Sequence, residues 1–316
     1  MKKILLYWHN FYFALSGKYN FKQKSRILWA FCGINWKIAT WLFDKYMLLY
    51  AWLDKYPNIK ELPDNKIVVS LTSFPARINK VWMVIDSILR QKLLPSKVCL
   101  YLTTEEFPNG LKDIPKRLLN YQKYGLEICF RDKNLRSHLK YYYALQEYKN
   151  STVITVDDDI YYNDNTISNL MNLHTKYPNC ICSNTIHVID YDENGLFKSY
   201  NDWILRAPQQ NPSHHNVALG YNGVLYPPFN FKSEMFECDT IKDTALRADD
   251  LWLKANEIIS GIKVVNGKYF CRGIEMSGSQ DISLGKINVT QNLNDIQWEK
   301  LCKHFGISKQ TIDNKE

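Results

Sequence analysis

The feature that most constrains the fold of this chain is an apolar run of strand length that ends in three consecutive carboxylates. Residues 152–156 read Thr-Val-Ile-Thr-Val and are followed at once by Asp157, Asp158 and Asp159. Such a run predicts a buried strand, so the carboxylates lie at its carboxyl end, where open α/β sheets bind their ligands. Because residues two apart in an extended chain point to the same face, we expect Asp157 and Asp159 to converge while Asp158 points away.

Two converging carboxylates predict a site for a hard divalent cation. Mg²⁺ or Mn²⁺ takes one or two carboxylates and completes its shell with substrate phosphates, which favours a diphosphate-bearing substrate over a structural metal. An acidic turn after a strand, without any metal, is the alternative interpretation of the same residues.

Strand and helix patterns alternate after a polar, proline-containing break at residues 61–65. The expected strands cover residues 67–71, 98–102, 126–130, 152–156 and 180–184, and the expected helices 81–91, 138–148 and 167–177. This alternation predicts an α/β fold with a mostly parallel central sheet and helices on both faces. We therefore expect two parts, an N-terminal helical segment of residues 1–65 and a main domain of residues 66–316.

The N-terminal segment carries most of the positive charge. The chain has a formal charge of +8, and residues 1–66 hold eleven Lys and Arg against four acids. Sixteen aromatic residues lie within residues 1–56, and the first acid is Asp44. This mixture suits the headgroup region of an anionic membrane surface, although a helical pair packed on the main domain explains it equally well and the two are compatible. The near-neutral remainder argues against nucleic acid as a partner.

Cysteine usage and hydropathy indicate the cellular compartment of the protein. The eight cysteines are scattered without a C-x-x-C pair, which favours a reducing environment. No secretory signal and no apolar run long enough for a bilayer span is recognised. We expect a cytoplasmic protein, peripheral on the inner face of the cytoplasmic membrane.

The second half of the chain adds candidate site segments. Residues 208–216 form a polar, proline-containing stretch that we expect to be a mobile or substrate-facing loop. Gly220 and Gly223 then permit close approach of the backbone to a ligand. Asp249 and Asp250 stand at the expected start of a helix, where capping and the helix dipole favour acids without any catalytic role. Four aromatic residues are candidate sugar platforms or ordinary core: Tyr221, Tyr226, Trp203 and Trp252.

Together these motifs resemble bacterial glycosyltransferases of the glycosyltransferase-A fold, most nearly the inverting, family-2-like group that builds capsule and lipopolysaccharide sugars. The resemblance covers residues 66–268. It rests on the first strand with its loop, the segment Ser87–Gln91, the Asp-rich strand end, the Gly-Val-Leu-Tyr-Pro-Pro segment and the late acidic pair.

The resemblance implies a role for each of these residues. Asp157 and Asp159 would hold Mn²⁺ or Mg²⁺ on the diphosphate of a nucleotide-sugar donor. Asp249 or Asp250 would act as general base toward a glycan or lipid-linked acceptor. The remaining residues implied in nucleotide and phosphate binding are Thr72, Ser73, Phe74, Pro75, Arg77, Asp132, Lys140 and Asp158. For Lys140 the alternative is a solvated helix lysine.

The chain departs from that family in two places, and other functions stay open. Residues 101–104 lack the acid expected after the second strand, and His304 is too isolated to be assigned as a metal ligand. A nucleotidyltransferase would be expected to carry a glycine-rich loop after the first strand, where residues 72–75 contain no glycine. A retaining glycosyltransferase and a sugar-nucleotide-binding scaffold without catalysis remain alternatives.

Overall fold

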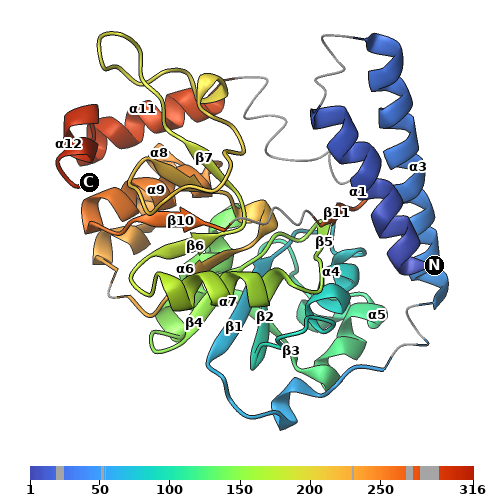
Figure 1. Cartoon of the computed structure of the whole chain (residues 1–316). Helices are drawn as coiled ribbons and strands as arrows, with labels where there is room; N and C mark the ends of the chain where they lie inside the picture. The colour runs from blue at the N-terminus through green and yellow to red at the C-terminus, as the bar shows by residue number, and fades with distance from the viewer. Residues whose placement is uncertain (19–24, 51–52, 54, 230, 268–272, 278–291) are drawn as a thin grey trace.

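A seven-stranded sheet in the order β10-β6-β9-β4-β1-β2-β3 forms the centre of the structure, a computed structural model (Figure 1). The structure describes residues 1–18, 25–50, 53, 55–229, 231–267, 273–277 and 292–316. The strands of the sheet are β1 (Ile67–Thr72), β2 (Lys97–Thr103), β3 (Leu126–Arg131), β4 (Thr152–Thr155), β6 (Ile181–Ser183), β9 (Val224–Tyr226) and β10 (Val264–Asn266). Neighbouring strands run parallel except around β9, which is antiparallel to β4 and β6. The predicted α/β fold with a mostly parallel sheet is confirmed.

Each face of the sheet carries its own hydrophobic core, because side chains alternate along every strand. In β1, Val69 and Leu71 enter one core while Val68 enters the other. The first core is covered by α4 (Val81–Ile88), α5 (Lys116–Leu119) and α7 (Thr166–Lys176). The second is covered by α6 (Leu139–Glu147), α8 (Cys238–Thr244), α9 (Asp249–Ser260), α11 (Leu293–Phe305) and α12 (Lys309–Asp313). Helices therefore pack on both faces, as predicted.

Short elements complete the described chain. Two small antiparallel ladders pair β5 (Ile160–Tyr161) with β11 (Ile274–Glu275), and β7 (Ile186–Val188) with β8 (Asn216–Ala218). The 3₁₀ turns are η2 (Ile59–Glu61), η3 (Gly110–Asp113), η4 (Asn120–Tyr124), η5 (Arg136–His138), η6 (Tyr200–Asp202), η7 (Gly220–Asn222) and η8 (Ser233–Phe236).

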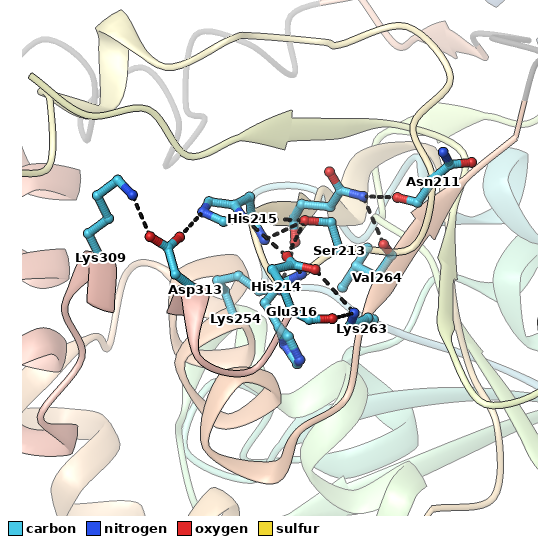
Figure 2. Close-up of polar contacts among 11 residues, drawn as sticks. Asn211, Ser213, His214, His215, Lys254, Lys263, Val264, Lys309, Asp313 and Glu316 are labelled. Atoms are coloured by element: carbon cyan, nitrogen blue, oxygen red, sulfur yellow. Dashed lines mark hydrogen bonds and ion pairs between the residues drawn. The ribbon is translucent and has the colours of Figure 1, made fainter. Parts of the chain in front are cut away.

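The segment expected to be a mobile or substrate-facing loop is held in place by hydrogen bonds to β10. The backbone N–H of Gln210 donates to Asn266 Oδ1 at 2.7 Å, and Ser213 and Val264 exchange backbone hydrogen bonds of 3.0 and 3.2 Å. Close to this loop the chain end is also fixed, as Figure 2 shows: Glu316 Oε1 accepts from Ser213 Oγ at 2.5 Å, and Lys263 donates to the Glu316 backbone oxygen at 2.5 Å. These contacts hold the loop and Glu316 beside β10.

Two N-terminal helices, α1 (Lys2–Lys18) and α3 (Arg26–Tyr50), lie side by side against the domain (Figure 1). Residues 19–24, 51–52 and 54 of this segment lie outside the described residues. Leu5, Phe43 and Met47 are buried in the same core as α4 and the sheet. Asp44 Oδ2 lies 3.4 Å from Lys80 Nζ and accepts from the Ser277 N–H at 3.2 Å. The packed helical pair that we expected as one alternative is therefore present. Among the helices described, none is long and apolar enough to cross a membrane.

Candidate active site

The three consecutive carboxylates lie where β4 ends, but they do not alternate as an extended strand would. The strand ends at Thr155, and residues 158–159 form a turn. Arg77 Nη1 lies 2.7 Å from Asp158 Oδ1 and 3.1 Å from Asp159 Oδ2. The expectation that Asp158 points away from Asp159 is wrong, because the period of two ends with the strand. Asp157 turns to a different partner, Lys140.

Asp158 ties the loop after β1 to the acidic turn. Its Oδ2 accepts from Ser73 Oγ at 2.6 Å and its Oδ1 from Arg77 at 2.7 Å. Burial raises the pKa of Asp158, against the opposing effect of Arg77. The loop itself is held by Thr72 Oγ1, which donates to the Tyr101 carbonyl at 2.9 Å. Both oxygens of Asp158 are engaged within the protein, which makes it a structural tie between two predicted ligand loops.

The remaining members of the loop after β1 lie around Arg77. The Arg77 guanidinium lies 5.4 Å from the centre of the Phe74 ring, while Pro75 is exposed. Arg77 thus approaches the acidic turn with Phe74 beneath it.

Lys140 joins the acidic turn to the second acidic pair. Its ammonium lies 2.7 Å from Asp157 Oδ1 and 2.9 Å from Asp249 Oδ2, and only 5% of its side chain is exposed. Its backbone oxygen accepts from Ser70 Oγ of β1 at 2.5 Å. Burial works against the charge, but Asp157, Asp249 and Asp250 hold the pKa of Lys140 well above its usual value. The alternative of a solvated helix lysine is excluded by this burial.

Asp249 and Asp250 lie in the first turn of α9 and have opposite protonation tendencies. Asp249 Oδ1 accepts from Ser137 Oγ at 2.8 Å, and, against the effect of burial, Lys140 and His138 lower the pKa of Asp249 to about 2. Asp250 Oδ1 accepts from the Gly220 N–H at 3.1 Å. Burial and the charge of Asp249 raise the pKa of Asp250 well above its usual value. Two neighbouring carboxyl groups whose pKa values are pushed apart are typical of acid–base sites.

Helix capping does not explain the side-chain contacts of Asp249 and Asp250. The residue at the N-cap of α9 is Ala248, which has no side-chain cap hydrogen bond. Asp249 bonds to Ser137 and Lys140, and Asp250 bonds to Gly220, so both side chains are directed to groups outside their own helix.

Gly220 lies where these side chains converge. A Cβ at this position would lie 2.8 Å from Lys140 Nζ, 3.3 Å from Asp250 Oδ1 and 3.5 Å from Asp157 Oδ1. The antiparallel strand β9 brings η7 to this point, because its amino end lies beside the carboxyl end of β4. A side chain on residue 220 would displace at least one of the three groups, so the position favours glycine.

The carboxylates of this cluster are candidate ligands for a divalent cation. Five carboxyl groups (Asp157, Asp158, Asp159, Asp249 and Asp250) lie around two cations, Arg77 and Lys140, and the carboxylates outnumber the cations even when Asp250 is protonated. Within the described residues, no three His, Cys, Asp or Glu side chains form a group that could hold a metal. Mg²⁺ and Mn²⁺ bind with one or two carboxylates when substrate phosphates complete the shell, and that arrangement fits this set.

Several predicted residues lie outside the cluster. Asp132 is exposed beyond the end of β3, three strands from β4, which corresponds to about 14 Å across the sheet. Trp203, Tyr226 and Trp252 are buried in the core and are not sugar platforms, whereas Tyr221 is half-buried.

Tyr162 is a site residue that sequence reasoning missed. Its hydroxyl accepts from the Asp157 N–H at 2.7 Å and donates to the Tyr221 carbonyl at 3.1 Å, so it fixes the backbone of the acidic turn to η7. A tyrosine five residues after Asp157 gives no signal of this role in the sequence, because its partner at residue 221 is supplied by the fold.

No protein-family model and no curated protein matches the sequence. Among solved structures, the chain is similar to the mannosyltransferase PcManGT from Pyrobaculum calidifontis in complex with GDP-Man and Mn²⁺, with 12% identity, a TM-score of 0.48, and 82% of this chain and 72% of that chain covered. It is also similar to S. aureus TarS 1-349, with 13% identity, a TM-score of 0.42, and coverage of 78% and 73%. A third is 4-diphosphocytidyl-2C-methyl-D-erythritol synthase from Anaerococcus prevotii, with 14% identity, a TM-score of 0.43, and coverage of 72% and 96%. At these levels none of them assigns an activity to this chain.

Proposed function

We propose that the chain is a metal-dependent glycosyltransferase of the glycosyltransferase-A type. It moves a sugar from a nucleotide-sugar donor to a glycan or lipid-linked acceptor, with inversion at the transferred carbon. The observation that carries the proposal is the single cluster in which Lys140 bridges Asp157, at the end of β4, and Asp249, at the start of α9. Donor-side and acceptor-side carboxylates thus meet at one edge of the sheet, as a transfer reaction requires.

On the donor side, the diphosphate leaves with negative charge. Asp157 and Asp159 are the residues that would hold Mn²⁺ or Mg²⁺, and a bound cation supplies electrostatic stabilisation to the departing diphosphate. Lys140 adds a buried positive charge beside Asp157. Arg77 holds Asp159 and Asp158 in place, so the acidic turn is fixed before the donor binds.

On the acceptor side, Asp250 is the proposed base. The acceptor oxygen forms a bond to the anomeric carbon as its proton passes to Asp250, and the bond from that carbon to the diphosphate oxygen breaks with its electron pair on the diphosphate. A raised pKa makes Asp250 a stronger base than an ordinary carboxylate. Asp249, whose pKa is about 2, stays ionised and balances Lys140.

We further propose, from the sequence resemblance, that the reaction belongs to cell-surface polysaccharide synthesis of the capsule or lipopolysaccharide kind, on the cytoplasmic side of the membrane. Nothing in the geometry of the cluster depends on this assignment.

The test is a screen of nucleotide sugars with the full chain, in Mn²⁺ and in a chelator. We expect metal-dependent release of the nucleoside diphosphate, lost in Asp250→Asn and kept in Asp239→Asn, whose side chain is 98% exposed. NMR of the product then gives the anomeric configuration. Formation of pyrophosphate from a nucleoside triphosphate and a sugar phosphate would establish a nucleotidyltransferase instead. Nucleotide binding without any turnover would establish the scaffold, and retention in the product would move the reaction to the retaining class.

A further inference from the structure

The N-terminal helix pair presents an apolar face to solvent, opposite to the face that packs on the domain. Along α3, Cys32, Ala39, Phe43 and Met47 are buried at helical spacing. The outward apolar residues of the same helix also recur at helical spacing, three, four or seven positions apart, and more than 40% of each is exposed: Ile27, Phe31, Ile34, Ile38, Trp41 and Leu48. When a helix is apolar on two opposite faces and one face packs on its own domain, the other face is available to a partner.

The outward face continues onto α1. Ile4, Tyr7 and Phe11 are exposed at the same spacing. Within α1, the rings of Tyr7 and Phe11 have centroids 6.2 Å apart and those of Phe11 and Tyr12 5.2 Å apart, and Tyr12 contacts Phe31 of α3 with a centroid distance of 5.9 Å. The exposed apolar residues therefore form one patch across both helices, and contiguous patches of this kind mark interaction sites.

The charges around this patch have one sign. Among the side chains described in residues 1–15 and 25–49, the exposed charged ones are all basic: Lys3, Arg26, Lys37 and Lys45. Lys45 lies 5.7 Å above the Trp41 ring, on the outward face. Asp44 is the one acid in residues 1–50, and it is buried against Lys80 and Ser277.

We propose that this outward face of α1 and α3 docks on an anionic bilayer surface, with its rings and aliphatic side chains at the headgroup level. Aromatic and basic residues together suit that interface, because the rings partition into it and the cations meet lipid phosphates. A second copy of the chain fits less well, because a symmetric contact would bring the basic side chains of two copies together with no exposed acid between them. The docking does not depend on the proposed reaction.

The test uses the full chain and vesicles of phosphatidylcholine alone or mixed with phosphatidylglycerol. We expect binding to the anionic vesicles that weakens with salt and falls about fivefold for Lys37→Gln and again for Lys45→Gln. Trp41→Asp should lower binding by more than about tenfold. Leu196→Asp is the matched control, because Leu196 is 65% exposed outside the helix pair, and it should bind like the unaltered chain.

Melting temperatures report whether each variant is folded, and substitutions at these exposed positions should leave the melting temperature unchanged. Failure of the folded full chain to bind anionic vesicles, or equal weakening by Leu196→Asp, would overturn the proposal. Light scattering that shows a dimer dissociated by Trp41→Asp, without vesicle binding, would assign the face to a second copy of the chain.

Discussion

Replacing Lys140 by methionine keeps much of the side-chain volume and removes the ammonium group that lies 2.7 Å from Asp157 and 2.9 Å from Asp249. Removing one partner of a buried ion pair costs about 3–5 kcal/mol, because the other partner keeps an uncompensated charge. Here the lysine is 5% exposed and two carboxylates lose their partner at once. We expect Lys140→Met to lower the free energy of unfolding by at least about 3 kcal/mol near neutral pH.

The same loss should depend on pH with a defined sign. In the native protein the pKa of Asp249 is about 2, so its contribution to stability is present above its unfolded pKa and is lost as pH falls toward 2. Without the ammonium group, which lowers the pKa of both Asp249 and Asp250, these neighbouring carboxylates repel each other and their folded-state pKa values rise. Stability of the variant then decreases as pH rises through those values. The deficit relative to the native chain should therefore be larger at about pH 8 than at about pH 5.

Urea unfolding at both pH values measures this, and Lys254→Met is the matched control. Lys254 is also fully buried, lies 2.9 Å from Glu257 Oε2 and donates to the Asn216 carbonyl at 2.7 Å. We expect a comparable loss of stability from Lys254→Met, but unchanged affinity for a nucleoside diphosphate with Mn²⁺, whereas Lys140→Met alters that affinity. A deficit for Lys140→Met below about 1 kcal/mol, or one independent of pH, would refute the reasoning.

Three further predictions concern the same cluster. Asp250→Asn should lower turnover at least about a hundredfold with nearly normal donor affinity. The rise of kcat/KM with pH through the raised pKa of Asp250 should vanish in this variant. If neither Asp250→Asn nor Asp249→Asn loses more than about tenfold in turnover in steady-state assays, the base lies elsewhere. We expect Mn²⁺ with a nucleoside diphosphate to raise the melting temperature of the native chain and Asp157→Asn and Asp159→Asn each to abolish that rise; a normal rise in both variants contradicts the metal assignment. Gly220→Ala should lower turnover at least about tenfold, because its Cβ would lie 2.8 Å from Lys140 Nζ, and full activity would show that the lysine moves freely.

The sequence predicted the architecture well where the signal is local. The parallel strands β1 to β4 contain apolar runs of strand length, and the structure places each within one or two residues of its predicted bounds. Strand β9 was not predicted, because three residues between Gly223 and two prolines carry no period to recognise. The orientation of Asp158 was predicted wrongly, since the alternation was extended past Thr155, where the strand ends.

The candidate site could be predicted as a set of residue types, but not as a set of contacts. The acidic turn and the late acidic pair stand out as motifs in the sequence. The ion pair from Lys140 to Asp249 joins residues more than a hundred positions apart, and only the fold brings them together. The opposite pKa shifts of Asp249 and Asp250 depend on that contact, so adjacent and identical residues receive different properties that no local pattern shows.

The insertion of β9 between β4 and β6 has a consequence for the order in which the protein folds during synthesis. Strands β1 to β4 are complete once residue 155 has left the ribosome, and their parallel pairs need nothing that follows. The free edge of β4 must wait for residues 224–226. A nascent chain thus carries an unpaired strand edge for roughly 70 residues of elongation, or about 4 to 14 seconds. That interval is when the chain is most exposed to misfolding and to chaperones.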